Sequence, residues 1–167
     1  MILIALGSNQ GDSPQIVEQA MRRLEAFADG TLLRSSLWRT SPVDCPPGSG
    51  DFVNAAVAFA ARSELTPERL LKALKALELE FGRGPAPVRN APRELDLDLL
   101  LFDDQTRNLA DFVLPHPRAA NRLFVLAPAA EVLPDASWPG LGLTIAELLA
   151  GLTSDERVQR LTHAAAG

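Results

Sequence analysis

Several features are scarce or missing in this sequence of 167 residues, and each absence excludes a class of protein. Cys45 is the single cysteine, so no disulfide can form within the chain, and a reducing compartment is the simplest environment for it. No apolar run approaches the roughly 20 residues that a membrane-spanning helix needs. The apolar opening from Ile2 to Leu6 has no basic leader and is too short for the core of a signal peptide. We therefore expect a cytoplasmic protein with no membrane partner.

A basic excess is missing as well. The chain has 16 lysines and arginines against 21 acidic residues, a formal net charge of −5. General nucleic-acid binding needs cations that displace counterions, so nucleic acid is not an expected partner. A phosphate-binding P-loop is also absent: Gly7 and Gly11 flank a predicted turn, but no Gly-x-x-x-x-Gly-Lys-Ser/Thr occurs there. A nucleotide would have to bind by other means.

The composition that remains is that of an ordinary globular domain, with 47% hydrophobic and 22% charged residues. We place one domain at residues 1–160 and a frayed, alanine-rich tail at residues 161–167. Sequence periodicity predicts strands at residues 2–6, 31–40, 52–60 and 93–102, and helices at residues 13–29 and 66–81. This order is the split β-α-β arrangement. The predicted fold class is α+β: a ferredoxin-like antiparallel sheet with helices packed on one face. A C-terminal helical extension follows, with helices at 121–132 and 144–149 and a last strand at 157–161.

The two main helices have start and stop signals. Ser13 before Pro14, and Thr66 before Pro67, each place a capping side chain ahead of the proline that helices favour at their first position. A glycine follows the last apolar residue of each helix and ends it.

The strand at residues 93–102 carries the first candidate site. Leucines alternate with acidic residues, so Asp96 and Asp98 point the same way, roughly 6.6 Å apart along the strand. Two such carboxylates repel each other unless a cation lies between them, and Mg²⁺ takes one or two carboxylates plus substrate phosphates. The alternative is a solvated strand face. Because residues 99–102 are apolar on both faces, we expect a central strand, where an unpaired acidic pair would be costly; this favours a metal site.

A basic loop leads into this strand. Residues 83–93 contain Arg83, Arg89 and Arg93, three prolines and no acidic residue. The prolines exclude a helix, and the guanidinium groups are suited to bidentate contacts with phosphate oxygens. A solvated basic loop is the alternative. Phosphoryl transfer requires Mg²⁺ to bridge the phosphates and cationic side chains to neutralise the developing charge, so arginines next to an acidic pair favour this reaction.

Other polar residues stand out from apolar surroundings. Asn54 lies on a strand face of small and aromatic residues; it is either a core asparagine satisfied by backbone, or a reader of a planar heterocycle with Phe52 stacked beside it. Glu78 lies at the edge of a buried helical stripe, where a solvated side chain is the default, although it could reach the metal region. A lone histidine is usually structural. Because Arg118 and Arg122 follow His116 closely in the sequence, the alternative is that His116 faces phosphate.

Separated motifs together resemble the family of 6-hydroxymethyl-7,8-dihydropterin pyrophosphokinases of folate biosynthesis, over nearly the whole chain to about residue 160. The matching segments are Ala5-Leu6-Gly7-Ser8-Asn9, Trp38-Arg39-Thr40-Ser41-Pro42, Asp51-Phe52-Val53-Asn54-Ala55-Ala56, Pro92-Arg93-Glu94-Leu95-Asp96-Leu97-Asp98, Leu114-Pro115-His116 and Asn121-Arg122. Any one of these motifs is weak evidence. Their agreement in order and spacing makes the resemblance specific.

The resemblance implies transfer of pyrophosphate from ATP to 6-hydroxymethyl-7,8-dihydropterin, leaving AMP, with two Mg²⁺ ions held by Asp96 and Asp98. It implies a monomer whose partners are these two small molecules. The pterin-binding positions would be Thr40, Ser41, Pro42, Val43, Phe52, Asn54, Phe124 and Arg122. The ATP-binding positions would be Glu78, Arg83, Arg89, Arg93, His116 and Arg122, and the catalytic positions Arg83, Arg93 and Asp98.

Some positions depart from the family pattern. Many relatives have Trp-Gly where this chain has Asn90-Ala91, so an aromatic lid over the pterin is expected to be missing. Glu94 replaces the usual threonine.

Two other functions compete with this one. A ferredoxin-like RNA-binding module would expose aromatics on a basic sheet face, whereas this face carries acids. Another Mg²⁺-dependent phospho- or nucleotidyltransferase would release ADP or pyrophosphate in place of AMP.

Overall fold

The computed structural model describes residues 1–10, 12–40, 51–82, 95–154 and 156–161. The predicted site residues Ser41, Pro42, Val43, Arg83, Arg89 and Arg93 lie outside these ranges, as do Asn90, Ala91 and Glu94 and the tail from residue 162.

Within the described residues, six strands form one antiparallel sheet in the order β10-β3-β4-β1-β5, with β2 beside β4. They are β1 (Ile2–Ser8), β2 (Leu33–Arg34), β3 (Trp38–Thr40), β4 (Phe52–Phe59), β5 (Asp96–Phe102) and β10 (Val158–Arg160). Since β4 lies between β1 and the pair β2 and β3, the split β-α-β topology and the α+β class are confirmed. The predicted strand at 31–40 is two short strands, each paired with a different half of β4.

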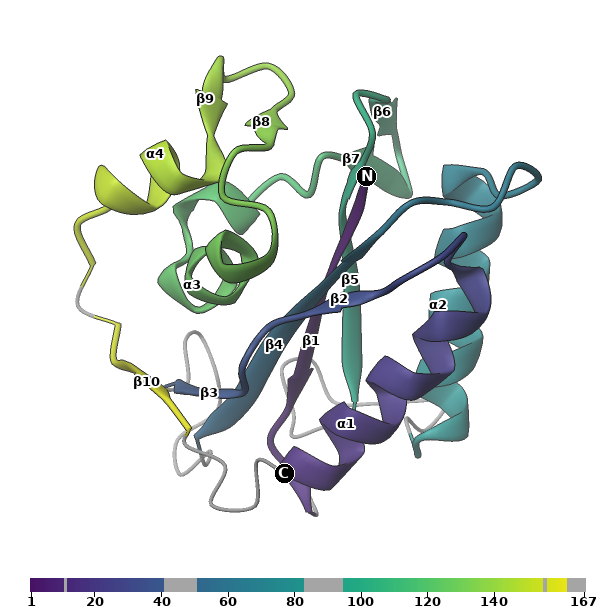
Figure 1. Ribbon diagram of the computed structural model, residues 1–167, viewed down its shortest axis with the longest axis horizontal. Coiled ribbons are helices and arrows are strands. Elements are labelled where there is room, and N and C mark those ends of the chain that lie inside the picture. The colour runs from purple at the N-terminus through teal and green to yellow at the C-terminus, as the bar shows by residue number, and fades with distance from the viewer. Residues whose placement is uncertain (11, 41–50, 83–94, 155, 162–167) are drawn as a thin grey trace.

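Two helices cover one face of the sheet (Figure 1): α1 (Ser13–Leu24), continued by the 3-10 turn Glu25–Phe27, and α2 (Pro67–Glu80). Their apolar sides pack on the odd-numbered residues of β4 and the even-numbered residues of β1. Thr66 caps α2 as predicted, its side chain accepting from the Arg69 N–H. The cap predicted for α1 is off by one residue: Asp12 caps it, and Ser13 is buried in the first turn.

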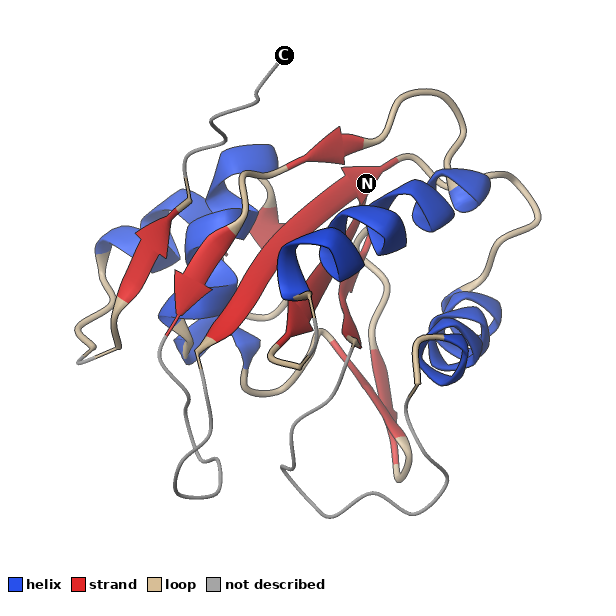
Figure 2. Cartoon of the chain, turned by 90° about the horizontal axis from the view of Figure 1, so that it is seen from below, coloured by secondary structure: helices blue, strands red, loops and turns tan. Residues whose placement is uncertain are grey.

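The helices of the split β-α-β unit thus lie on one face as expected, and the C-terminal extension covers the opposite face (Figures 1 and 2). The turn Ala119–Asn121, α3 (Leu123–Val132) and α4 (Ile145–Ala150) form this second layer, with the hairpin of β8 (Ser137–Trp138) and β9 (Leu143–Thr144). Ala56 and Ala58 of β4 are buried against α3, and their small side chains let the helix approach the sheet closely. The C-terminal extension therefore completes the core.

The acidic strand is placed differently from the expectation. Among the described residues, β5 pairs with β1 and ends the sheet, so it is not central. Residues 99–102 of β5 are apolar on both faces because both faces of the sheet are covered there. A shift of register opposite Leu3 and Ile4 makes Leu100 an extra residue, which moves Leu101 to the α3 face and breaks the predicted alternation. Beyond β5, β6 (Arg107–Leu109) and β7 (Phe112–Leu114) form a separate hairpin.

Candidate functional site

Three predicted positions meet in one row across the sheet. Gly7 of β1 pairs with Asn54 of β4 on one side and with Asp96 of β5 on the other. Leu97 and Leu99 belong to the core beneath α1 and α2, so Asp96 and Asp98 point to the opposite, α3-covered face. Asn54 lies on that same face, because its neighbours on β4 also alternate. The pterin and metal candidates therefore share one face at one end of the strands.

Asn54 is held in a fixed orientation. It is 7% exposed, and its side-chain amide donates to the hydroxyl of Thr40, which is 2% exposed, over 2.5 Å. A Cβ atom added to Gly7 would lie 2.7 Å from Asn54 Oδ1, so the close approach of this amide to β1 requires glycine. Phe52, half-buried, pairs with Thr40 across the strands. The predicted heterocycle reader is thus a rigid polar group beside an aromatic ring.

Glu78 is buried, not solvated. It is 4% exposed, and its Oε2 accepts from the backbone N–H of Leu97 over 2.8 Å. Leu97 stands between Asp96 and Asp98 on β5. The carboxylate therefore supports the part of the strand that carries the acidic pair, from the side of β5 away from β1. The default expectation of a solvated glutamate is wrong.

His116 lies close to three charged side chains. Burial lowers its pKa, and the positive charges of Arg122 and Arg118 lower it further, while Asp96 opposes them. His116 Nδ1 accepts from the Arg118 backbone N–H over 3.4 Å, which places the ring proton on Nε2. Burial and the two arginines therefore favour the neutral form of this imidazole, which lies near Asp96.

The start of α3 brings two more predicted residues to this face. The guanidinium carbon of Arg122 lies 5.5 Å from the ring centroid of Phe124, within the range of a cation–π contact. Both side chains are half-buried, and Phe124 packs against the core of the α3 layer. The positive charge of Arg122 lies close enough to His116 to lower its pKa, so this helix start and His116 lie on the same side of the site.

The donor set suits Mg²⁺. Nowhere in the described ranges do three or more His, Cys, Asp or Glu side chains form a metal-holding group. A structural zinc site would need such a group, whereas Mg²⁺ keeps several waters and uses one or two carboxylates with substrate phosphates. Asp96 and Asp98 are half-buried and share one face, so they fit that pattern.

Two glutamates at this end of the sheet were missed by sequence reasoning. Glu131 of α3 accepts from the Trp38 indole over 2.6 Å and from the Ser36 hydroxyl over 2.8 Å. Glu156 accepts from backbone N–H groups at the start of α3. Their partners are 32 to 95 residues away along the chain, so no local motif signals them.

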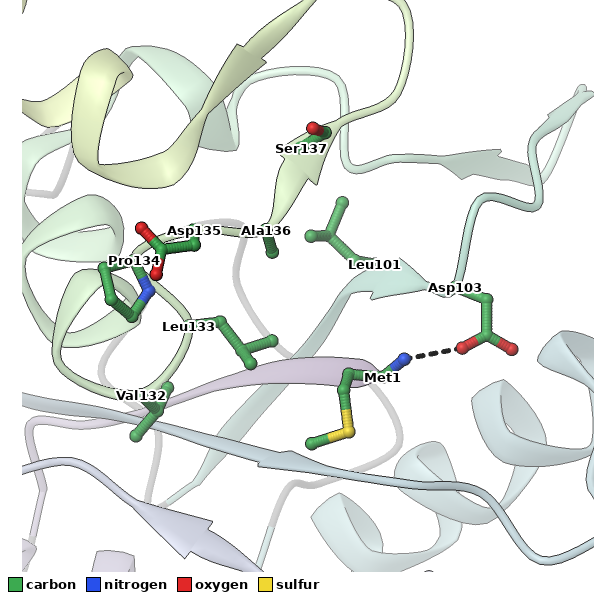
Figure 3. A pocket seen from close by; sticks show the side chains of 9 residues that line it. All are labelled: Met1, Leu101, Asp103, Val132, Leu133, Pro134, Asp135, Ala136 and Ser137. Carbon is green, nitrogen blue, oxygen red and sulfur yellow. Dashed lines mark hydrogen bonds and ion pairs between the residues drawn. The ribbon is translucent and has the colours of Figure 1, made fainter.

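A pocket at the other end of the sheet contains none of the predicted site residues (Figure 3). Its volume is about 440 Å³, and it lies between Met1, the end of β5 and the segment after α3, with Leu101, Leu133 and Ala136 among its lining. The Met1 amine and the Asp103 carboxylate pair over 2.6 Å at its rim. It lies beyond the opposite ends of β1 and β5, so it is separate from the candidate site.

The fold and the site together define an α+β protein with an acidic pair, a buried asparagine and a cationic helix start at one end of a split β-α-β sheet. Residues 3–134 match the model of the 7,8-dihydro-6-hydroxymethylpterin-pyrophosphokinase (HPPK) family. The chain belongs to this family, which confirms the resemblance found in its motifs.

Relatives of similar length support the match. A Bacillus subtilis protein named 2-amino-4-hydroxy-6-hydroxymethyldihydropteridine pyrophosphokinase is 41% identical over 130 residues, which cover 77% of this chain and 75% of the relative. A Pseudomonas aeruginosa protein of the same name is 37% identical over 164 residues, 98% of each chain.

Solved structures agree on the fold. A Plasmodium falciparum HPPK-DHPS mutant crystallised with SDX-DHP superposes with a TM-score of 0.69 at 16% identity, over 89% of this chain. The wild-type protein with pterin and p-hydroxybenzoate gives 0.65 at 15% identity. The match spans 43% and 41% of those longer chains.

Among the described residues, no helix has the length and apolarity to span a bilayer.

Proposed function

We propose that the protein transfers the terminal pyrophosphoryl unit of ATP to the hydroxymethyl oxygen of 6-hydroxymethyl-7,8-dihydropterin, as the name of its family indicates. The observation that supports this proposal is the row Asn54–Gly7–Asp96. Asn54, the proposed reader of the heterocycle, and Asp96, a proposed Mg²⁺ ligand, lie on the two strands that pair with β1 at Gly7. The proposal includes a cytoplasmic monomer and a single catalytic domain at residues 1–160.

The pterin would bind on the Asn54 side. Within the part of the chain that the structure describes, the side-chain amide of Asn54 bonds only to Thr40, which leaves one N–H and the oxygen for a planar ring edge. Phe52 and Phe124 supply aromatic surface for the ring, and Ser41, Pro42 and Val43 are assigned to this pocket by family likeness. Rigid placement of the ring fixes the direction of its hydroxymethyl group.

The triphosphate would bind on the Asp96 side. Asp96 and Asp98 would hold two Mg²⁺ ions, which would neutralise charge on the phosphates of bound ATP. His116 offers its Nε2–H to a phosphate oxygen, and Arg122 adds a positive charge beside it. Family likeness assigns Arg83, Arg89, Arg93 and Glu78 to the ATP side. Glu78 would act there by supporting β5 through the hydrogen bond from the Leu97 N–H.

The reaction requires no protein nucleophile. The hydroxymethyl oxygen attacks the β-phosphorus and forms a new P–O bond, while the bond from that phosphorus to the oxygen bridging to the α-phosphate breaks. AMP leaves with the bridging oxygen, and the hydroxyl proton is released. The residues described here position the two substrates and stabilise the charge that develops.

An assay of product nucleotides tests this function. The protein is incubated with MgATP, with and without the pterin alcohol, and nucleotides are separated by chromatography. We expect AMP in an amount equal to the pterin diphosphate formed, and no AMP when the pterin is omitted. Release of ADP or pyrophosphate would assign the site to another transferase, and no turnover with binding of RNA would favour the RNA-binding alternative.

A further inference from the structure

The first turn of α3 is capped by a side chain from the C-terminal end of the chain. Arg122, the N-cap residue, makes no capping hydrogen bond with its side chain. Glu156 takes its place: its carboxylate accepts from the backbone N–H of Leu123 over 3.0 Å and from that of Phe124 over 3.4 Å. A carboxylate here satisfies two donors that the helix cannot satisfy and complements the positive end of its dipole.

Glu156 is itself held in place. Its Oε2 accepts from the Ser154 hydroxyl over 2.8 Å, and its own N–H donates to the same hydroxyl oxygen over 3.0 Å. This local turn fixes the direction of the carboxylate before it meets α3. The side chain loses little further freedom when it caps the helix.

The residues that follow Glu156 bind the other wall of the proposed pterin pocket. In β10, Val158 pairs with Thr40, the partner of Asn54, and the Leu161 N–H donates to the Leu37 carbonyl over 2.8 Å. Residues 156–161, which we name the C-terminal clasp, thus join the start of α3 to β3 (Figure 1). The clasp lies at the β10 end of the sheet order, whereas the acidic pair is on β5 at the opposite end.

We propose that Glu156 is a positioning residue for the pterin: it fixes the helix start that carries Phe124 and, through the clasp, sets that ring against the Thr40–Asn54 pair. This inference rests on the function proposed above and adds a residue beyond the matched family segment, which ends at residue 134. The same helix start carries Arg122, but MgATP also depends on Asp96, Asp98 and His116, which lie outside α3, so Glu156 acts on pterin affinity more than on MgATP affinity.

Substitution of Glu156 separates positioning from general stability. In Glu156→Ala we expect KM for the pterin to rise about tenfold, the effect of losing a helix cap, while KM for MgATP changes less than about threefold. Glu156→Gln retains one acceptor oxygen, so most of the loss should be restored. Far-UV circular dichroism and the Tm establish that each variant is folded. If the alanine variant does not fold, the smaller rise of the pterin KM in Glu156→Gln, which loses one of the two acceptor oxygens, makes the same comparison with the KM for MgATP.

Glu147 provides a matched control. It caps another helix start, where its side chain accepts from the Thr144 N–H over 2.9 Å in the capping box of α4. Glu147→Ala should lower the Tm and leave KM for the pterin unchanged. Equal rises of both KM values in Glu156→Ala, or a pterin KM that Glu147→Ala raises as much, would overturn the positioning role.

Amide hydrogen exchange tests the clasp independently of any activity. The N–H groups of Leu123 and Phe124 should exchange faster in Glu156→Ala than in the parent protein, and unchanged exchange would contradict the cap. If the parent protein forms no pterin diphosphate, the proposed function fails while this measurement still decides whether Glu156 holds α3.

Discussion

The side-chain oxygen of Asn54 lies so close to Gly7 that a methyl group on Gly7 would sit 2.7 Å from it. Asn54 cannot move away freely, because it is buried and its amide is tied to Thr40. In Gly7→Ala, either the amide or the strand must shift. We expect kcat/KM for the pterin to fall on the order of a hundredfold, because small misplacements of a substrate-orienting group are costly.

Gly151→Ala is the control for this prediction, since its Cβ would make an ordinary 3.5 Å contact with the Glu147 carbonyl. That variant should keep the parent kcat/KM. Measurement of pterin binding by fluorescence, with and without an ATP analogue, checks where the loss arises. A Gly7→Ala protein that binds pterin as the parent does would show that the Asn54 amide is not the reader of the ring.

The acidic pair should be essential for turnover and dispensable for folding. Asp96→Asn and Asp98→Asn keep the side-chain size and remove one negative charge each, which weakens any Mg²⁺ site. We expect AMP formation to fall by roughly a thousandfold or more. Circular dichroism and Tm should stay near those of the parent protein. Rates near those of the parent would reject the metal assignment.

Much of this site could be predicted from the sequence because its parts are local. Alternation along β5 correctly placed Asp96 and Asp98 on one face, and the proline at the start of α2 correctly located its cap at Thr66. The split topology followed from the order of elements, and the pairing of β4 with β1 confirms it.

The rest depended on contacts between distant parts of the chain. The bulge at Leu100 is a property of the β1–β5 pairing, so alternation within β5 alone could not reveal that Leu101 changes face. Burial of Glu78 depends on the position of Leu97, 19 residues further along the chain. The apolar residues on both sides of β5 predict a central strand. In the structure they reflect the helices that cover both faces of the sheet, while β5 itself lies at the edge of the described sheet.

Glu78 should matter for both stability and catalysis. Removing its carboxylate leaves the Leu97 N–H without this buried partner, a cost of about 1–3 kcal/mol in the free energy of unfolding. Since Leu97 lies between the two aspartates, Glu78→Ala should also lower kcat by about 10- to 100-fold and weaken the dependence on Mg²⁺. Urea denaturation and a Mg²⁺ titration of the AMP assay measure the two effects.

Glu80→Ala, two residues away on the same helix, is the matched control. Glu80 is exposed and pairs with Arg23 over 2.7 Å at the surface, so its loss should change neither quantity appreciably. Glu78→Gln retains an acceptor oxygen for the Leu97 N–H and should restore most of the stability. If Glu78→Gln is as unstable as Glu78→Ala, the hydrogen bond to Leu97 is not the source of the effect.

His116 should make the folded protein sensitive to mild acid. Its pKa is lowered in the folded state, first by burial and then by Arg122 and Arg118, so the unfolded chain binds more protons in this range. The free energy of unfolding then rises with pH. The contribution of neutral His116 is fully present above about 6.5, the ordinary histidine pKa, and is lost as the pH falls through the lowered pKa of the folded state.

Urea denaturation of the metal-free protein, in EDTA between pH 5 and pH 8, measures this contribution. His116→Asn keeps an acceptor near the position of Nδ1, which receives the Arg118 N–H, but it does not titrate. The variant should therefore lose less stability than the parent protein on going from pH 7 to pH 5. His163, the other histidine, is present in both proteins and cancels in the comparison. An equal loss in His116→Asn would mean that folding does not lower the pKa of His116, and a steeper loss would mean that folding raises it; either result would contradict the assignment of His116 as a neutral donor to phosphate.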